Sequence, residues 1–231
     1  MAQFWWVVYP YICLMIMIVG SLYRFTYRQI AWGSKSSQML EQASLKWGSR
    51  LFHWGIIFVF FGHVMGLVIP MWVYADLGVT PEFYHLNAII FGGVIGILCW
   101  LGAGILLIRR SFNLRVRANS HFSDFLTLDV LMVVLTLGLA VTLIYDVFDQ
   151  RYEYRATIGP WFRELLTLHP DASLMTKVPL IFQLHIIAAF ALFAMSPFTR
   201  LVHIWSYPLH YVGRSPIQYR SRARYRHSPA K

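Results

Sequence analysis

Four histidines lie inside long apolar stretches of this chain, where polar side chains are rare. His53 and His63 share one stretch with no Asp, Glu, Lys or Arg between them, and His185 and His203 share a second stretch in which Arg200 is the one charged residue between them. A polar group inside a membrane is costly and by default marks a functional site. Because imidazole is a common axial ligand of haem iron, we interpret these side chains as candidate haem ligands.

The elements that must position these histidines are membrane helices. Of the 231 residues, 58% are hydrophobic and only 13% are charged, which lies outside the balance of a soluble domain. Apolar runs of ~20 residues are long enough to span ~30 Å of hydrocarbon. We therefore predict an all-α integral membrane protein with five transmembrane helices, at about 4–24, 51–74, 84–108, 124–146 and 178–207.

The distribution of basic residues predicts the orientation. Most of the 20 Lys and Arg lie in 24–50, 109–117 and 200–231, which fall on one side of the predicted membrane. The positive-inside rule makes that side cytoplasmic and leaves the N-terminus outside. The net charge of +10 therefore reflects topology and indicates no nucleic-acid partner. Residues 1–208 would form the transmembrane domain, and 209–231 a basic cytoplasmic tail.

Two further features limit the chemistry and the organisation of the chain. Cys13 and Cys99 both lie in apolar runs, which excludes a disulfide framework and a Cys-ligated iron–sulfur or zinc site within this chain. The run 4–24 has no basic segment before it and no small-residue cleavage site, so we expect it to remain as a helix. The longest connection, 146–177, is expected to form a short helix that caps the outer face.

Antiparallel packing of the second and fifth helices would pair the four histidines by depth. His53 and His203 would lie toward the cytoplasm, and His63 and His185 toward the exterior, so two pairs would hold two six-coordinate b haems. Straight helices give unequal spacings, ~15 Å between the histidines of the second helix and ~27 Å between those of the fifth. A tilted haem, a helix crossing angle or a kink at Pro197 would absorb this difference.

Each inner histidine follows an arginine by three residues. Arg50 precedes His53 and Arg200 precedes His203, and residues at this spacing share a helix face. A haem propionate is one partner for such guanidinium groups, so both arginines are candidate propionate contacts. Extension of the side chain to the lipid headgroups is the alternative, and it fits Arg50 better than the deeper Arg200.

Other functions are compatible with membrane histidines. A single buried histidine more often completes a hydrogen-bonded core or a proton path, but four in two pairs favour haem ligation. A zinc or copper permease would gather its ligands at one depth. A haem-free transporter or structural anchor is the remaining alternative, and it predicts a purified chain without Soret absorbance.

Around the four membrane histidines, the chain resembles a known family, the gamma subunit of membrane-bound respiratory nitrate reductase. The resemblance is carried by 51–55, 62–66, 182–185 and above all 197–206, with further likeness at 35–40 and 109–117. The loop segments 159–164 and 170–175 are similar to those of members from Gram-positive bacteria. The resemblance extends over nearly the whole chain.

This resemblance implies a di-haem cytochrome b that oxidises menaquinol or ubiquinol in a bacterial or archaeal cytoplasmic membrane. His53 and His203 would ligate the inner haem, and His63 and His185 the outer haem. Electrons would pass inward to an iron–sulfur beta subunit and on to a molybdenum alpha subunit that reduces nitrate, while protons are released outside. Related gamma-like cytochromes of heterodisulfide reductase or sulfite-linked complexes are the alternative partners.

The expected quinol site departs from the family pattern at one position. A lysine precedes the third helix in a well-known member, whereas this chain has Tyr84 and His85 there. Either side chain is able to hydrogen-bond a quinone oxygen or accept a proton, so both are candidate quinol contacts. As an alternative, both are ordinary residues of the membrane interface.

Overall fold

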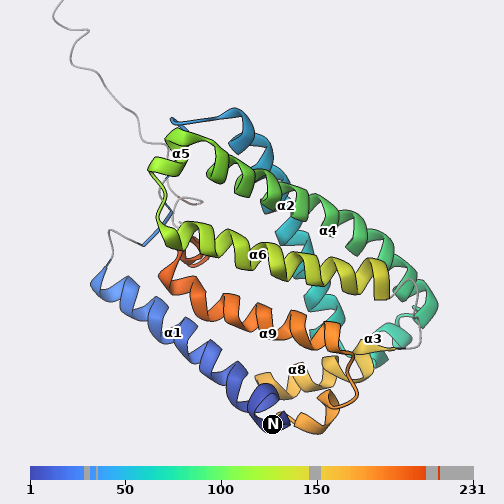
Figure 1. Cartoon of the computed structure of the whole chain (residues 1–231). Helices are drawn as coiled ribbons and strands as arrows, with labels where there is room; N and C mark the ends of the chain where they lie inside the picture. The colour runs from blue at the N-terminus through green and yellow to red at the C-terminus, as the bar shows by residue number, and fades with distance from the viewer. Residues whose placement is uncertain (29–31, 35, 146–151, 207–212, 214–231) are drawn as a thin grey trace, which may run out of the picture.

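The computed structural model describes all residues except 29–31, 35, 146–151, 207–212 and 214–231. The described residues form helices and connecting turns, with no β-strand among them. Figure 1 shows the long helices running alongside one another, with short helices at both ends of the bundle. Apart from Gly213, the predicted basic tail lies outside the described residues.

Five helices are long and apolar enough to cross a membrane, which confirms the number predicted from the sequence. These spans are Phe4–Tyr27, Ala43–Val68, Pro81–Phe112, Phe122–Ile144 and Leu180–Phe198. Their α-helical parts are α1 (Tyr9–Tyr27), α2 (Ala43–His63), α4 (Pro81–Phe112), α6 (Phe122–Ala140) and α9 (Leu180–Met195). Short helices follow α2, α4 and the fourth span, namely α3 (Met71–Asp76), α5 (Leu114–Ala118) and α8 (Ile158–Leu166).

Local sequence explains where several helices begin and end. Pro81 occupies the first turn of α4, where its missing N–H is tolerated, and the Thr80 side chain accepts the Phe83 N–H at 3.2 Å. The second span was expected at 51–74, but it starts at Ala43 and ends at Val68. Pro70 explains the early end, because a proline disfavours helical backbone in the residue before it.

The helices form a continuous series in which each packs on the next. α2 packs on α4, α4 on α6, α6 on α9 and α9 on α1, an order that can be followed in Figure 1. Small residues allow the closest of these contacts. A Cβ at Gly102 would lie 2.3 Å from the backbone nitrogen of Phe52, and a Cβ at Gly55 would lie 2.7 Å from Cβ of Cys99. These contacts fix α2, which carries two of the four histidines, against α4.

The fifth helix is interrupted before it reaches its last histidine. The sequence predicts one continuous span over 178–207, and this expectation is wrong because α9 ends at Met195. The chain continues as a short 3₁₀ turn, η7 (Ser196–Phe198), an extended residue at Thr199, and a second 3₁₀ turn, η8 (Arg200–Ile204). Pro197 lacks the N–H that would continue the helix. His203 therefore lies on η8, and the straight-helix spacing of ~27 Å does not apply.

The connection between the fourth and fifth spans, which includes α8, covers the end of the bundle at which α3 lies. As expected, this connection forms a short helix, α8, and its Trp161 side chain is only 1% exposed. The indole nitrogen of Trp161 donates to the backbone oxygen of Trp6 at 2.9 Å. α8 is thus anchored to the first span and covers the neighbouring ends of the other helices.

Candidate functional site

The structure brings the four histidines together in two pairs, between α2 on one side and α9 and η8 on the other. The ring centroids of His53 and His203 lie 6.0 Å apart, with an angle of 66° between the ring planes. Those of His63 and His185 lie 6.1 Å apart, with the planes at 24°. These are the pairs expected from antiparallel packing, and the interruption after α9 brings His203 opposite His53 although the sequence spacings are unequal.

Each of the four imidazoles is held by a hydrogen bond from its Nδ1 to a backbone carbonyl. The accepting carbonyls belong to Ser49 for His53 (2.7 Å), Val59 for His63 (2.8 Å), Val134 for His185 (3.1 Å) and Arg200 for His203 (2.6 Å). A carbonyl oxygen only accepts, so Nδ1 carries the proton in every ring. The Nε2 atom is then left with its lone pair, which is the arrangement found in histidines that ligate a metal.

His185 differs from the other three because its carbonyl partner belongs to another helix. The ring of His185, on α9, reaches α6, where Val134 accepts its Nδ1 proton. Gly138 on α6 leaves the room for this contact, because a Cβ there would lie 3.0 Å from Cε1 of His185. Gly138 is thus a determinant of the site that the sequence analysis did not identify, since nothing local marks a glycine in an apolar helix as the neighbour of a distant histidine.

The space around the pairs fits a large planar ligand. His53 and His63 are exposed although they lie in an apolar span, so a membrane would surround them with hydrocarbon unless another group covers them. A Cβ at Gly62, next to His63, would have no neighbour within 4 Å. Two imidazoles that bind one iron from opposite sides hold their ring centres roughly 6 Å apart, because each metal–nitrogen bond is ~2 Å long. The described residues therefore fit haem.

The number of protein ligands also fits haem better than a metal site made by protein alone. Among the described residues, no group of three or more His, Cys, Asp or Glu side chains is placed to hold a metal ion. Each histidine pair supplies two nitrogen donors. A porphyrin supplies the other four ligands of a six-coordinate iron, whereas zinc and copper sites need further protein donors.

The two arginines near the inner pair have different surroundings. Arg50 is exposed, one turn before His53. The guanidinium of Arg200 binds Asp124 at the start of α6, with Nε donating to Oδ1 at 2.6 Å and Nη2 donating to Oδ2 at 2.9 Å. The protein itself thus supplies a carboxylate partner for Arg200, which the sequence analysis did not predict. The propionate contacts of both arginines remain predictions.

Tyr84 lies in an aromatic and cationic cluster at the opposite end of the bundle, beyond His63. Its ring centroid is 4.8 Å from that of Tyr74 on α3, and the guanidinium carbon of Arg155 lies 4.0 Å above its ring. A Cβ at Gly66, in the turn that follows His63, would lie 2.8 Å from the hydroxyl oxygen of Tyr154 and 3.4 Å from that of Tyr84. The sequence analysis missed Tyr154 and Arg155 because their connection bears no regular pattern.

His85 and Glu153 complete this cluster. Nε2 of His85 is buried and has no hydrogen-bond partner among the described residues. Arg155 donates from Nε and Nη2 to the two carboxylate oxygens of Glu153, at 2.9 and 2.8 Å. Burial alone would raise the pKa of Glu153, but these bonds hold the pKa below its usual value of 4.5. Burial also raises the pKa of the Tyr154 hydroxyl far above its usual range, so that hydroxyl is a proton donor.

Comparison with known proteins identifies the family of this chain. Residues 2–222 match the family described as nitrate reductase gamma subunit. The chain belongs to this family. It is 46% identical to the nitrate reductase gamma chain of Bacillus subtilis over 96% of this chain and 99% of that protein. Identity to the respiratory nitrate reductase 2 gamma chain of Escherichia coli is 37%, over 95% of this chain and 96% of that protein.

A third relative places the family sequence within a longer protein. The nitrate reductase-like protein NarX of Mycobacterium tuberculosis is 38% identical over 96% of this chain, which corresponds to 34% of NarX. The resemblance noted in the sequence is therefore confirmed, both for the family and for its extent. With five apolar helices, this member of the nitrate reductase gamma subunit family is a multi-pass membrane protein, and its family supports a role as a membrane electron-transfer subunit of an oxidoreductase.

Proposed function

We propose that this chain is a di-haem cytochrome b that oxidises membrane quinol near the outer face and delivers electrons to cytoplasmic subunits that reduce nitrate. The observation that carries the proposal is the presence of two imidazole pairs with ring centroids 6.0 and 6.1 Å apart. The pairs lie at two depths between α2 and the fifth span. Family membership supports the partner enzyme, and the nitrate site itself would lie in another subunit.

The chain's own residues hold and tune the two cofactor sites. His53 and His203 would ligate an inner b haem through Nε2, and His63 and His185 an outer one. Iron held in this way carries one electron at a time. The Nδ1–H bonds to backbone carbonyls orient the rings and increase their basicity as ligands. Arg50 and Arg200 are the candidate propionate contacts.

Quinol would bind beside the outer pair, at the cluster around Tyr84. The buried Nε2 of His85 has no protein partner among the described residues and is able to accept a proton from a quinol hydroxyl. Tyr84 and Tyr154 present hydroxyl groups near Gly66, in the turn that follows His63. A quinol in this position would lie beside the segment that directly follows His63, a ligand of the proposed outer haem.

The proposed orientation makes the reaction conserve energy. The N-terminus lies outside and the basic connections lie in the cytoplasm, following the positive-inside rule. Quinol protons are released outside while electrons cross inward. Each electron that crosses moves one charge through the membrane potential, which is worth ~2.3 kcal/mol per 100 mV. The electrons then leave to an iron–sulfur beta subunit and a molybdenum alpha subunit.

The deciding experiment is a haem count on the purified complex, with identification of the subunits that copurify. We expect two b haems per chain by pyridine haemochrome assay, together with nitrate reductase subunits. Copurifying heterodisulfide reductase or sulfite-linked subunits would instead support the alternative partners. A chain without Soret absorbance would refute the cytochrome and leave a transporter or structural anchor.

A histidine substitution tests which residues hold the haems. His203→Ala should leave one haem per chain, with the remaining haem still reduced by quinol but unable to pass electrons to nitrate. His169→Ala is the matched control, because His169 is an exposed histidine outside the spans. A His203→Ala variant that retains two haems would exclude this residue as a ligand.

A further inference from the structure

Among the residues that the structure describes, Asp124 is the only buried carboxylate, and it lies next to the turn that carries His203. Only 5% of the residue is exposed. It accepts hydrogen bonds from three other residues: Arg200 (2.6 and 2.9 Å), Arg110 (3.0 Å) and the backbone N–H of His121 (3.1 Å). A buried carboxylate that receives two guanidinium groups and a backbone N–H is fully satisfied in this geometry.

Arg200, which is bound by Asp124, also orients His203. The guanidinium of Arg200 donates hydrogen bonds to Asp124, while the backbone oxygen of Arg200 accepts the Nδ1 proton of His203 at 2.6 Å. Side chain and carbonyl belong to the same residue, the first of η8. Fixing the guanidinium against α6 therefore limits the directions in which the carbonyl, and with it the imidazole, are able to point.

The short element that carries His203 needs such an anchor. η8 is a 3₁₀ turn of 5 residues that follows an extended residue. 3₁₀ turns have weak hydrogen-bond geometry and little stability of their own. By contrast, His53, His63 and His185 lie on long α-helices. The backbone that carries His203 thus depends on tertiary contacts more than the backbone that carries the other three histidines.

We propose that Asp124 is a positioning residue for the inner haem site, acting on His203 through Arg200. This inference rests on the proposed function, because it takes His203 to be a haem ligand. Among the described residues, Asp124 makes no hydrogen bond to the imidazole of His203 or His53. Its carboxylate also offsets two guanidinium charges at this end of the bundle, so its removal leaves Arg110 and Arg200 without their shared anion.

The variant Asp124→Asn separates the positioning role of Asp124 from its role in capping the start of α6. The amide oxygen of Asn still accepts the N–H of His121 and keeps the start of α6, but the charge that holds Arg200 is lost. Glu41→Gln is the matched control. Glu41 accepts from the buried Arg109 at 2.6 Å, the same distance as in the Asp124–Arg200 pair. No hydrogen bond or ion pair joins Glu41 to η8 among the described residues. Both variants are made in the full complex and extracted from membranes.

Haem content and redox potential are measured, because a purely structural role would not change them selectively. We expect Asp124→Asn to weaken haem retention at the inner site by roughly 10-fold or more. The detergent-washed complex should then carry close to one haem per chain, and the remaining inner haem should titrate at a higher midpoint potential, because loss of a nearby negative charge favours the reduced state. Glu41→Gln should retain two haems with unchanged potentials.

The possible outcomes separate this proposal from the proposed function. If the unaltered complex holds no haem, the proposed function fails. If it holds two and Asp124→Asn leaves content and both potentials unchanged, only the positioning role is refuted. If Asp124→Asn does not accumulate, Arg200→Lys is used in its place, because it keeps the charge but loses the two-pronged contact with Asp124. An unaltered inner haem in that variant would equally overturn the proposal.

Discussion

At the scale of single residues, the site depends on groups that surround the histidines. All four rings donate a proton from Nδ1 to a carbonyl and leave Nε2 free, so the protein selects one tautomer at each position. Three of these carbonyls lie within four residues of their histidine in the sequence. His185 is the exception, because its carbonyl belongs to Val134 on α6.

Gly138→Ala tests how closely His185 fits against α6. The added methyl group would lie 3.0 Å from Cε1 of His185, so the ring must move and its bond to Val134 weakens. We expect this variant to lose much of the outer haem while the inner haem remains. Gly104→Ala is the control, because a Cβ there has no neighbour within 4 Å. Equal haem contents in the two variants would contradict the expectation.

Glu153→Gln tests the ion pair beside Tyr84. The carboxylate has a pKa below its usual 4.5, so the stability that it contributes is fully present above that pH and is lost as the pH falls through the lower folded value. Because the side chain is 37% exposed, the contribution is about 1 kcal/mol or less. The melting temperatures of the variant and the wild type should differ at pH 7 and should become equal in acid. A difference that persists at low pH would point to another cause.

At the scale of elements, two interruptions decide where ligands lie. Pro70 ends the second span soon after His63 and allows α3 and Tyr74 to approach Tyr84. Pro197 ends α9 before His203, and Arg24 of α1 then donates to the freed carbonyls of Pro197 and Thr199 at 2.6 and 3.0 Å. Both interruptions replace a regular helix by a turn that is stabilised by another helix.

The contact between α2 and α4 predicts a severe effect for Gly102→Ala. Its Cβ would lie 2.3 Å from the backbone nitrogen of Phe52, and backbone atoms cannot rotate away as a side chain does. The helices must separate, at a cost of about 1–3 kcal/mol or more, and both haems should be affected because α2 carries His53 and His63. The measurement is the haem content and amount of the complex in membranes. Gly92→Ala is the control, since its Cβ would have a nearest neighbour at 3.9 Å, an ordinary contact.

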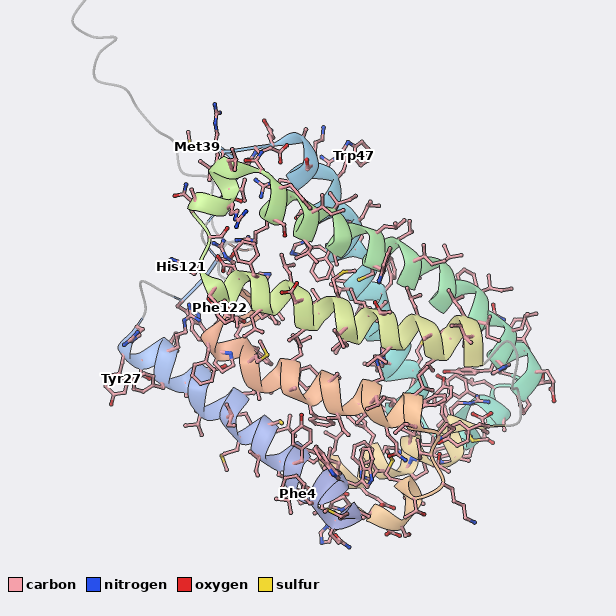
Figure 2. All side chains as sticks on the ribbon, in the orientation of Figure 1. Phe4, Tyr27, Met39, Trp47, His121 and Phe122 are labelled. Carbon is pink, nitrogen blue, oxygen red and sulfur yellow. The ribbon has the colours of Figure 1, made fainter. Side chains whose placement is uncertain are left out.

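At the scale of the whole molecule, the two ends have different surfaces. Figure 2 shows Met39, His121 and Phe122 at the end opposite to Phe4. At the first of these ends, which the proposed orientation makes cytoplasmic, apolar side chains protrude beyond the spans. They are Met39, Phe112, Leu114 and Phe122, all at least 78% exposed. Exposed apolar groups of this kind are suited to contact with another subunit or with lipid.

Leu114→Asp distinguishes a subunit contact from a lipid contact. We expect the variant to keep both haems but to copurify with several-fold less of the cytoplasmic subunits. Leu77→Asp at the other end is the control, because that side chain is 73% exposed compared with 78% for Leu114. Full recovery of the cytoplasmic subunits with Leu114→Asp would assign this surface to lipid.

Much of the architecture could be predicted because membrane helices are encoded locally. Apolar runs of sufficient length predict the five spans, and the family follows from segments around the histidines. The depth of each histidine follows from its place in a span, which is why the pairs could be expected. The continuous fifth helix was predicted wrongly, because apolar composition continues past Pro197 although the hydrogen-bonding pattern does not.

The sequence by itself therefore determined the number of spans, the family and the candidate ligands, since these depend on hydropathy and on the order of residues along the chain. Only the tertiary structure decided what supports the ligands. Asp124 meets Arg200, Gly138 meets His185 and Arg155 meets Tyr84 across large separations in sequence. Such contacts depend on how the helices rotate and cross. Apolar side chains pack almost equally well against lipid and against other helices, so the packing arrangement is fixed by small residues and buried charges.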